Sequence, residues 1–257
     1  TPPTPDATPT PSPTPTPSPA PDATPTVVRN RIFVTNAIQS GSAEYDFVLG
    51  GGDDEILAGD WDGNGRTGFA ARTGRHIVEV DELGNPHGAI AYGSRTDTHY
   101  NVGDWDGNGT DTVSVRRGNV FFVVDTADAS GDATELGYGR AGDEVFVGDW
   151  NGDGIDTFAV RRGNNFFVRN SVTTGVADLE FGYGRAGDDV FVGDWNGDGV
   201  DTFAVRRGNV IHIRNDLRTG VAETTVGFGT ARDILIVGDW DGDGVDTFAV
   251  HRREPAG

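Results

Sequence analysis

Oxygen-bearing side chains alternate with other residues at five places in this chain. The run Gly-Asp-Trp-[Asp/Asn]-Gly-[Asp/Asn]-Gly occurs at 59–65, 103–109, 148–154, 193–199 and 238–244. Counted from its first Asp, each loop carries Asp or Asn at positions 1, 3 and 5 and glycine at position 6. The alternation directs successive oxygens toward one centre, and Ca²⁺ takes roughly six to eight oxygen ligands. Each loop is therefore a candidate Ca²⁺ site.

Other interpretations of these loops are weaker. Asp and Asn also build turns without any metal. Mg²⁺ suits the loops less well than Ca²⁺, because its tight octahedral shell takes fewer protein ligands. An EF-hand is excluded, since position 12 of the third loop is Val160 rather than Glu and the flanking residues are typical of strands.

The loops belong to a longer repeat. Each contains one of the five tryptophans, which are separated by 44 residues once and by 45 residues three times. A fixed period of this size indicates a propeller, a solenoid or an array. Within residues 189–233, short β-branched and aromatic stretches are bounded by Gly, Asn and Asp, which predicts four short strands and almost no helix. Four-stranded units of about 45 residues match the blades of an all-β propeller.

The repeat region begins and ends with half a unit. Residues 31–36 and 46–52 are equivalent to the third and fourth strands, and residues 233–240 and 246–252 to the first and second. Pairing of the two halves would close a five-bladed ring and hide the sheet edges. The alternative is an open array whose half units complete a neighbouring molecule, giving a head-to-tail filament. We expect the closed five-bladed β-propeller, as a monomer.

The loop between two apolar strands, preceded by Phe181-Gly182 or by Gly227-Phe228-Gly229, resembles FG-GAP and VCBS-type repeats. Such repeats form blades of the integrin α-subunit head and of many bacterial extracellular proteins, and their loop is a Ca²⁺-binding hairpin. The resemblance covers residues 27–253 and implies up to five Ca²⁺ ions, with the backbone carbonyl at loop position 7 as a further ligand. The side-chain ligands it implies are Asp60, Asp62 and Asn64; Asp104, Asp106 and Asn108; Asp149, Asn151 and Asp153; Asp194, Asn196 and Asp198; Asp239, Asp241 and Asp243.

The sequence departs from this family at the end of the loop. The family usually has Asp at position 9, whereas this chain has Gly or Thr there and places an acid at position 8. Because neighbouring strand residues point to opposite faces, the position-8 acid is not expected to reach the ion directly. We expect weakened affinity, with the first loop weakest because it lacks both acids. The position-8 residues are Thr67, Asp111, Asp156, Asp201 and Asp246.

Other residues recur in register with the loops. The tryptophans are expected to pack between blades, with sugar stacking as the alternative. Of paired arginines such as Arg161-Arg162, we expect one to be solvated and the other to balance an acidic neighbour. The Tyr-Gly-Arg turns after the fourth strand either serve as turns or line pockets suited to a glycan. The candidate pocket residues are Tyr92, Arg95, Tyr138, Arg140, Tyr183, Arg185 and Phe228.

Composition narrows the classes of partner. The 257 residues have a net charge of −20, which argues against binding to nucleic acid or anionic membranes. No apolar run approaches the ~18 residues of a membrane helix. The five His share no metal-ligand spacing, and no nucleophile elbow or phosphate loop occurs, so no enzyme is expected. Residues 1–26 hold 11 of the 13 prolines and predict an extended stalk, followed by the propeller at 27–253 and a tail at 254–257.

These features favour a binding module over a catalyst. We expect a secreted, Ca²⁺-stabilised propeller carried on a stalk at the surface of a bacterium, with carbohydrate or a surface protein as its ligand. The alternatives are a subunit of an extracellular filament rigidified by Ca²⁺ and an accessory domain of a secreted hydrolase. Of the 40 acidic residues, 15 lie within the five nine-residue loops, so the negative charge is concentrated where the cations are expected.

Overall fold

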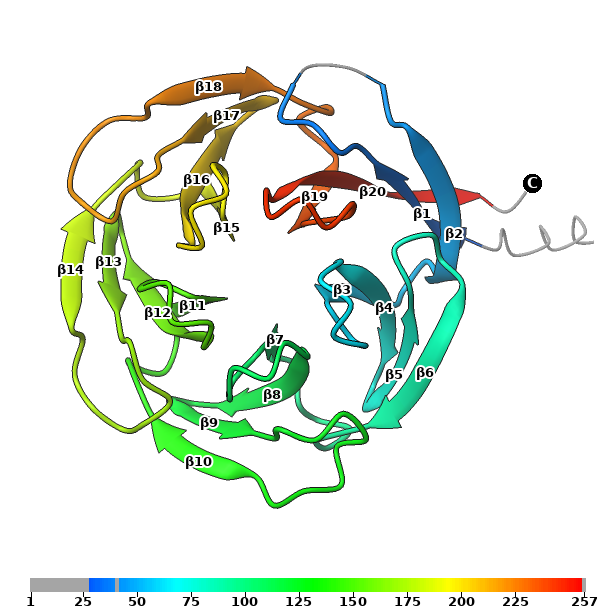
Figure 1. Ribbon diagram of the computed structural model, residues 1–257, viewed down its shortest axis with the longest axis horizontal. Helices are drawn as coiled ribbons and strands as arrows, with labels where there is room; N and C mark the ends of the chain where they lie inside the picture. The colour runs from blue at the N-terminus through cyan, green and yellow to red at the C-terminus, as the bar shows by residue number, and fades with distance from the viewer. Residues whose placement is uncertain (1–27, 40–41, 256–257) are drawn as a thin grey trace, which may run out of the picture.

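The chain forms a ring of five antiparallel sheets around a central opening (Figure 1). This computed structural model describes residues 28–39 and 42–255, and the predicted stalk lies outside them. The described residues form four-stranded sheets without any helix, so none offers a helix long and apolar enough to cross a membrane. The predicted all-β, five-bladed propeller is confirmed.

Four blades are built from consecutive strands. Blade 1 contains β3 (Glu55–Gly59), β4 (Gly68–Thr73), β5 (His76–Val80) and β6 (Pro86–Ala91). Blade 2 contains β7 (Tyr100–Gly103), β8 (Thr112–Arg117), β9 (Val120–Val123) and β10 (Thr134–Gly137). Blade 3 contains β11 (Glu144–Gly148), β12 (Thr157–Arg162), β13 (Asn165–Val168) and β14 (Leu179–Gly182). Blade 4 contains β15 (Asp189–Gly193), β16 (Thr202–Arg207), β17 (Val210–Ile213) and β18 (Thr224–Gly227).

Blade 5 joins the two ends of the repeat region. Its order is β19 (Ile234–Gly238), β20 (Thr247–Pro255), β1 (Val28–Val34) and β2 (Tyr45–Gly51). β20 and β1 pair antiparallel over seven residues each, from Val28 opposite Pro255 to Val34 opposite Ala249. A buried hydrogen bond of 2.8 Å between Asn30 Oδ1 and His251 Nε2 adds to this seam. The half units therefore close the ring within one chain, as predicted.

The core lies between neighbouring blades. The second strand of a blade is apolar at its centre, as in Phe158-Ala159-Val160 of β12, because a neighbouring blade covers each of its faces. The ring of Trp150 stacks on Phe203 of the next blade with centroids 4.9 Å apart, and Trp240 of blade 5 stacks on Phe69 of blade 1 at 4.5 Å. All five tryptophans are buried between blades, which leaves no indole face exposed for a sugar.

Candidate functional site

Each acidic loop links the first strand of a blade to the second, and the five loops stand on one face around the central opening (Figure 1). In the third loop, Asp149 Oδ1 accepts the backbone N–H groups of Gly152 and Asp153 at 2.8 and 3.2 Å, while Oδ2 accepts that of Gly154 at 2.7 Å. Both glycines have positive φ, 74° and 80°, which a residue with a side chain rarely adopts. The carboxylate at position 1 therefore organises the loop around itself.

The fifth loop brings its three predicted ligands together. Carboxylate oxygens of Asp239, Asp241 and Asp243 lie within 4.8 Å of one another. Burial and the charges of Asp243 and Asp239 raise the pKa of Asp241. A set of three carboxylates at this separation fits the oxygen-only ligand preference of Ca²⁺.

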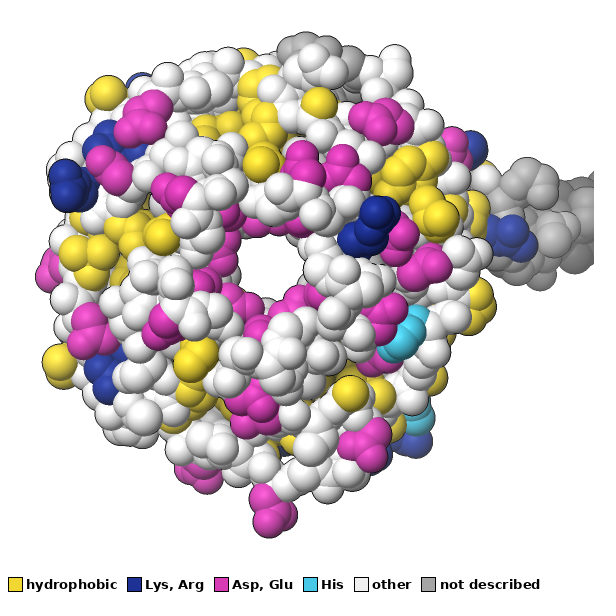
Figure 2. Space-filling model, viewed as in Figure 1, with side chains coloured by type: hydrophobic (Ala, Val, Ile, Leu, Met, Phe, Trp, Pro, Cys, Tyr) yellow, Lys and Arg dark blue, Asp and Glu magenta, His cyan; other side chains and the backbone are white. Residues whose placement is uncertain are grey.

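The other loops hold the same positions close together, with Asn in place of one carboxylate. In the third loop, Asn151 Nδ2 donates to Asp153 Oδ2 at 3.0 Å, and Asn196 and Asp198 repeat this contact in the fourth. In the first loop the backbone N–H of Asn64 donates to both Asp60 and Asp62. The second loop repeats that pattern with Asp104, Asp106 and Asn108. Figure 2 shows acidic side chains gathered around the central opening on this face.

The acid at loop position 8 contacts the loop of the preceding blade. The backbone N–H of Asp156 donates to the Asp104 carbonyl at 2.7 Å, and the Asp104 N–H donates to Asp156 Oδ2 at 2.9 Å. We call this pair of hydrogen bonds a loop clamp. Five clamps link the five loops in a closed circle. The clamped pairs are Asp111 with Asp60, Asp156 with Asp104, Asp201 with Asp149, Asp246 with Asp194, and Thr67 with Asp239.

The loop clamp explains the glycine that precedes every loop. A Cβ on Gly148 would lie 2.7 Å from Asp201 Oδ2 and 2.9 Å from Val192 Cγ1. A Cβ on Gly103 would approach Asp156 Oδ2 and Val147 Cγ1 in the same way. The glycine is needed because the next blade packs directly against this point of the backbone.

Four of the five clamps place a carboxyl group in a poorly hydrated position. Burial raises the pKa of Asp156 and of Asp246 to about 7, and it raises those of Asp111 and Asp201 well above the usual range. The charges of neighbouring loop and clamp carboxylates act in the same direction, while the accepted backbone N–H opposes them. Four of the five clamps therefore hold a carboxyl group that is costly to ionise.

The predicted pocket residues fall into two groups. The hydroxyls of Tyr92, Tyr138 and Tyr183 each donate to a third-strand carbonyl of the next blade, at 3.0, 2.8 and 2.8 Å. These rings are wholly or mostly buried and join blades, and Phe228 is buried at the equivalent place. Arg95, Arg140 and Arg185 are exposed beside them. The structure thus separates the aromatic rings from solvent and leaves only the arginines accessible.

The paired arginines differ from the sequence expectation, because acids and carbonyls engage both members. Arg162 forms a bidentate ion pair with Asp143, with N–O distances of 2.8 and 2.6 Å, whereas its neighbour Arg161 pairs with Glu144. Arg252 forms the same bidentate ion pair with Asp233, and its hydrogen bonds lower the pKa of Asp233 to about 2. The acids that receive the second arginine follow the Tyr-Gly-Arg turns, so the turn and the arginine pair form one unit.

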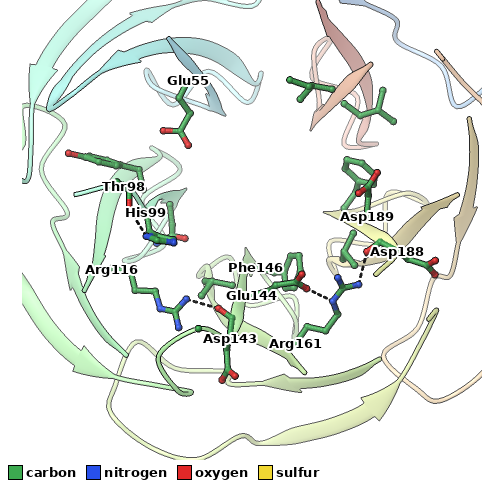
Figure 3. A pocket seen from close by; sticks show the side chains of 18 of the residues that line it. Glu55, Thr98, His99, Arg116, Asp143, Glu144, Phe146, Arg161, Asp188 and Asp189 are labelled. Carbon is green, nitrogen blue, oxygen red and sulfur yellow. Dashed lines mark hydrogen bonds and ion pairs between the residues drawn. The ribbon is translucent and has the colours of Figure 1, made fainter. Parts of the chain in front are cut away.

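A cavity of about 980 Å³ lies in the ring where the first strands begin (Figure 3). It is therefore at the opposite end of those strands from the acidic loops. Its wall includes Glu55, Glu144 and Asp189, together with Arg116, Arg161 and Arg206. None of the residue patterns described above pointed to this cavity. The signal was the position four residues before the glycine that ends each first strand, which holds Glu55, His99, Glu144, Asp189 and Ile234.

No family model and no curated protein matches this chain. Among solved structures, the chain is similar to a lectin of Agrocybe aegerita described as recognising non-reducing terminal N-acetylglucosamine, with 15% identity, a TM-score of 0.49, and coverage of 87% of this chain and 83% of the lectin. Two structures of BBS1N in complex with ARL6DN match at 10% and 11% identity, with TM-scores of 0.37 and 0.38. They cover 78% and 85% of this chain, and 78% and 82% of their own. Likenesses this distant carry no inference about a ligand or partner.

Proposed function

We propose that this chain is a calcium-binding β-propeller that acts as a recognition module outside the cell, at a bacterial surface. The observation that carries the proposal is the convergence of the Asp239, Asp241 and Asp243 carboxylates within 4.8 Å. The same loop recurs in every blade, and in all five copies the position-1 carboxylate accepts three backbone N–H groups.

Calcium would supply positive charge where the chain concentrates negative charge. In each loop, the side chains at positions 1, 3 and 5 would hold the ion. Because metal ions bind the folded loops and not the unfolded chain, their binding free energy adds to the stability of the propeller. The fifth loop, with three carboxylates, is expected to bind most tightly.

The ranking of the first loop as the weakest needs a different basis. The sequence predicts the weakest site there because neither Thr67 nor Gly68 is an acid, but the position-8 residue contacts the neighbouring loop rather than its own. Thr67 Oγ1 accepts the N–H of Asp239 at 3.0 Å, so the substitution acts on the clamp of the fifth loop. The first loop then differs little in ligand chemistry from the second, which has the same Asp, Asp and Asn set.

A role in binding, without catalysis, fits a closed ring with exposed arginines at equivalent turns. Carbohydrate or a surface protein is the proposed ligand class, and a glycan array is the direct screen for the first. A filament built by strand exchange is less favoured, because β20 and β1 already pair over seven residues each within one chain. Sedimentation would separate discrete rings from fibres.

Thermal unfolding in Ca²⁺ and in EGTA tests the proposal. At a free Ca²⁺ concentration about 100-fold above Kd, one site adds about 2.7 kcal/mol. For a domain of this size the melting temperature should rise by roughly 5–10 °C per site. Asp241→Asn should reduce the rise, whereas Asp132→Asn, the same charge change at an exposed position outside the loops, should not. Equal melting temperatures in Ca²⁺ and EGTA would refute calcium binding.

A further inference from the structure

Ion pairs of one kind recur at the cavity end of the blades. The residue that opens the first strand lies opposite an arginine of the second strand, as Glu55 faces Arg72, Glu144 faces Arg161 and Asp189 faces Arg206. In all three blades the carboxylate and the guanidinium are in contact. These acids and arginines therefore neutralise one another around the cavity wall.

Blade 2 breaks this pattern. His99 takes the place of the acid, and its carbonyl accepts the backbone N–H of Arg116 at 3.0 Å. The Arg116 guanidinium donates only to the carbonyls of Asp143 and Arg140, at 2.6 and 2.7 Å. Among the described residues, no carboxylate lies within ion-pair distance of Arg116, and its Nε has no partner.

Arg116 is only 7% exposed, yet it lines the cavity. Burial lowers its pKa, which the more distant charge of Asp143 offsets in part. In blades 3 and 4 the corresponding Nε donates to Glu144 and to Asp189. A guanidinium held in a protein wall without a carboxylate is costly, and an external anion would relieve that cost.

The rest of the wall suits a polyhydroxylated molecule. The side chains of Glu55, Glu144 and Asp189 are 41%, 56% and 58% exposed, and each directs one oxygen to its arginine. Their other oxygens can accept hydrogen bonds from hydroxyl groups. Phe146, labelled in Figure 3, supplies apolar surface in the same wall, as does Phe191. The volume of about 980 Å³ accommodates a small saccharide.

We propose that this cavity binds a carboxylate-bearing sugar, whose carboxylate lies beside His99 and pairs with Arg116. The ligand carboxylate takes the role that Glu144 and Asp189 play toward the arginines of their own blades. The hydroxyls bond to the exposed acid oxygens, and a face of the sugar packs against phenylalanine. The proposal rests on the recognition role proposed above, but it uses none of the acidic loops and needs no Ca²⁺.

Calorimetric titration of the full chain with D-glucuronate and with D-glucose tests this site. Because a charge-assisted pair distinguishes the two sugars, glucose should bind at least about 10-fold more weakly than glucuronate. His99→Glu supplies an internal carboxylate for Arg116, and it should weaken glucuronate binding at least about 10-fold while raising the melting temperature. The matched variant His99→Gln leaves Arg116 unpaired and should therefore bind glucuronate at least about 10-fold more tightly than His99→Glu.

Arg116→Gln should also lose glucuronate binding, and the two His99 variants keep the test decisive if that variant does not fold. Absence of glucuronate binding to the original chain, or undiminished binding to His99→Glu, would overturn the proposal. Repeating the titration in EGTA separates it from the calcium proposal. Glucuronate binding without a Ca²⁺ effect on melting would refute calcium binding alone, and the reverse result would refute the sugar site alone.

Discussion

Replacing Asp156 with Asn tests the loop clamps directly. The carboxyl Oδ2 of Asp156 accepts the backbone N–H of Asp104, and Asn keeps an oxygen that can do the same. What Asn removes is the ionisable group. Burial, together with the charges of Asp104 and Asp149, raises the pKa of Asp156 to about 7. The folded chain therefore holds a carboxylate at neutral pH in a place that favours the neutral acid.

The size and pH dependence of the effect follow from this shift. The unfolded Asp ionises near 3.8 and the folded one near 7, so ionisation removes stability as the pH rises from about 4 to 7. At 1.36 kcal/mol per pKa unit, the full shift corresponds to about 4 kcal/mol. Local rearrangement around the charge reduces the observable gain to about 2–4 kcal/mol above pH 7. Below pH 4 the acid is neutral in both states, and Asn should bring almost no gain.

Circular-dichroism melting in EGTA, at pH 4 and at pH 8, measures both the size of the stability gain and its dependence on pH. At pH 8, Asp156→Asn should raise the melting temperature by roughly 5–12 °C, since 1 kcal/mol shifts a domain of this size by about 2–4 °C. Asp156→Ala removes the acceptor of the Asp104 N–H and should forfeit about 1–3 kcal/mol of that gain. Asp132→Asn controls for net charge alone. A less stable Asp156→Asn at pH 8, or the same shift at both pH values, would refute the assignment of a costly buried charge.

Three further outcomes follow from the contacts between blades. Because Arg252 lowers the pKa of Asp233 to about 2, the pair should stabilise the fold by about 2 kcal/mol above pH 4. This stability is lost as the pH falls toward 2. In an acid titration followed by fluorescence, Asp233→Asn should therefore show a smaller loss of stability between pH 4 and pH 2. Phe203→Ala empties the stack between Trp150 and Phe166 and should cost about 3–5 kcal/mol in urea unfolding, whereas Val221→Ala, 80% exposed, should cost almost nothing. Tyr183→Phe removes the hydroxyl that donates to the His212 carbonyl and should cost about 1 kcal/mol, so an unchanged urea midpoint would contradict its role between blades.

The blade and its closure were readable from the sequence because the repeat supplies its own alignment. The single Trp in each unit indicates the period of the repeat, and apolar stretches bounded by glycine indicate the strands. The half units at either end favoured a closed ring over an open array, and the pairing of β20 with β1 within one chain confirms the ring. Strand order in a repeated blade is thus a local property, which short-range patterns determine well.

The contacts between blades were not readable in this way. Asp156 lies 52 residues from Asp104, and nothing local shows that a position-8 carboxyl reaches the preceding loop rather than its own. The same holds for Tyr183, whose Tyr-Gly-Arg turn suits a pocket as well as a turn until its hydroxyl is seen on the His212 carbonyl. The unpaired Arg116 could have been inferred from the sequence. At the position four residues before the glycine that ends the first strand, the chain has His99 in blade 2, whereas the units on both sides have an acid.

The proposed calcium sites and the loop clamps share one residue in every blade, and this couples them. The position-1 Asp offers its carboxylate to the proposed ion, and its backbone N–H and carbonyl to the clamp of the next blade. An ion held beside Asp104 would favour the charged form of Asp156, because an opposite charge nearby lowers the pKa of an acid. Calcium would then remove much of the cost that Asn removes in EGTA. The rise in melting temperature on adding Ca²⁺ should therefore be smaller for Asp156→Asn than for the original chain, since both changes relieve the same buried charge.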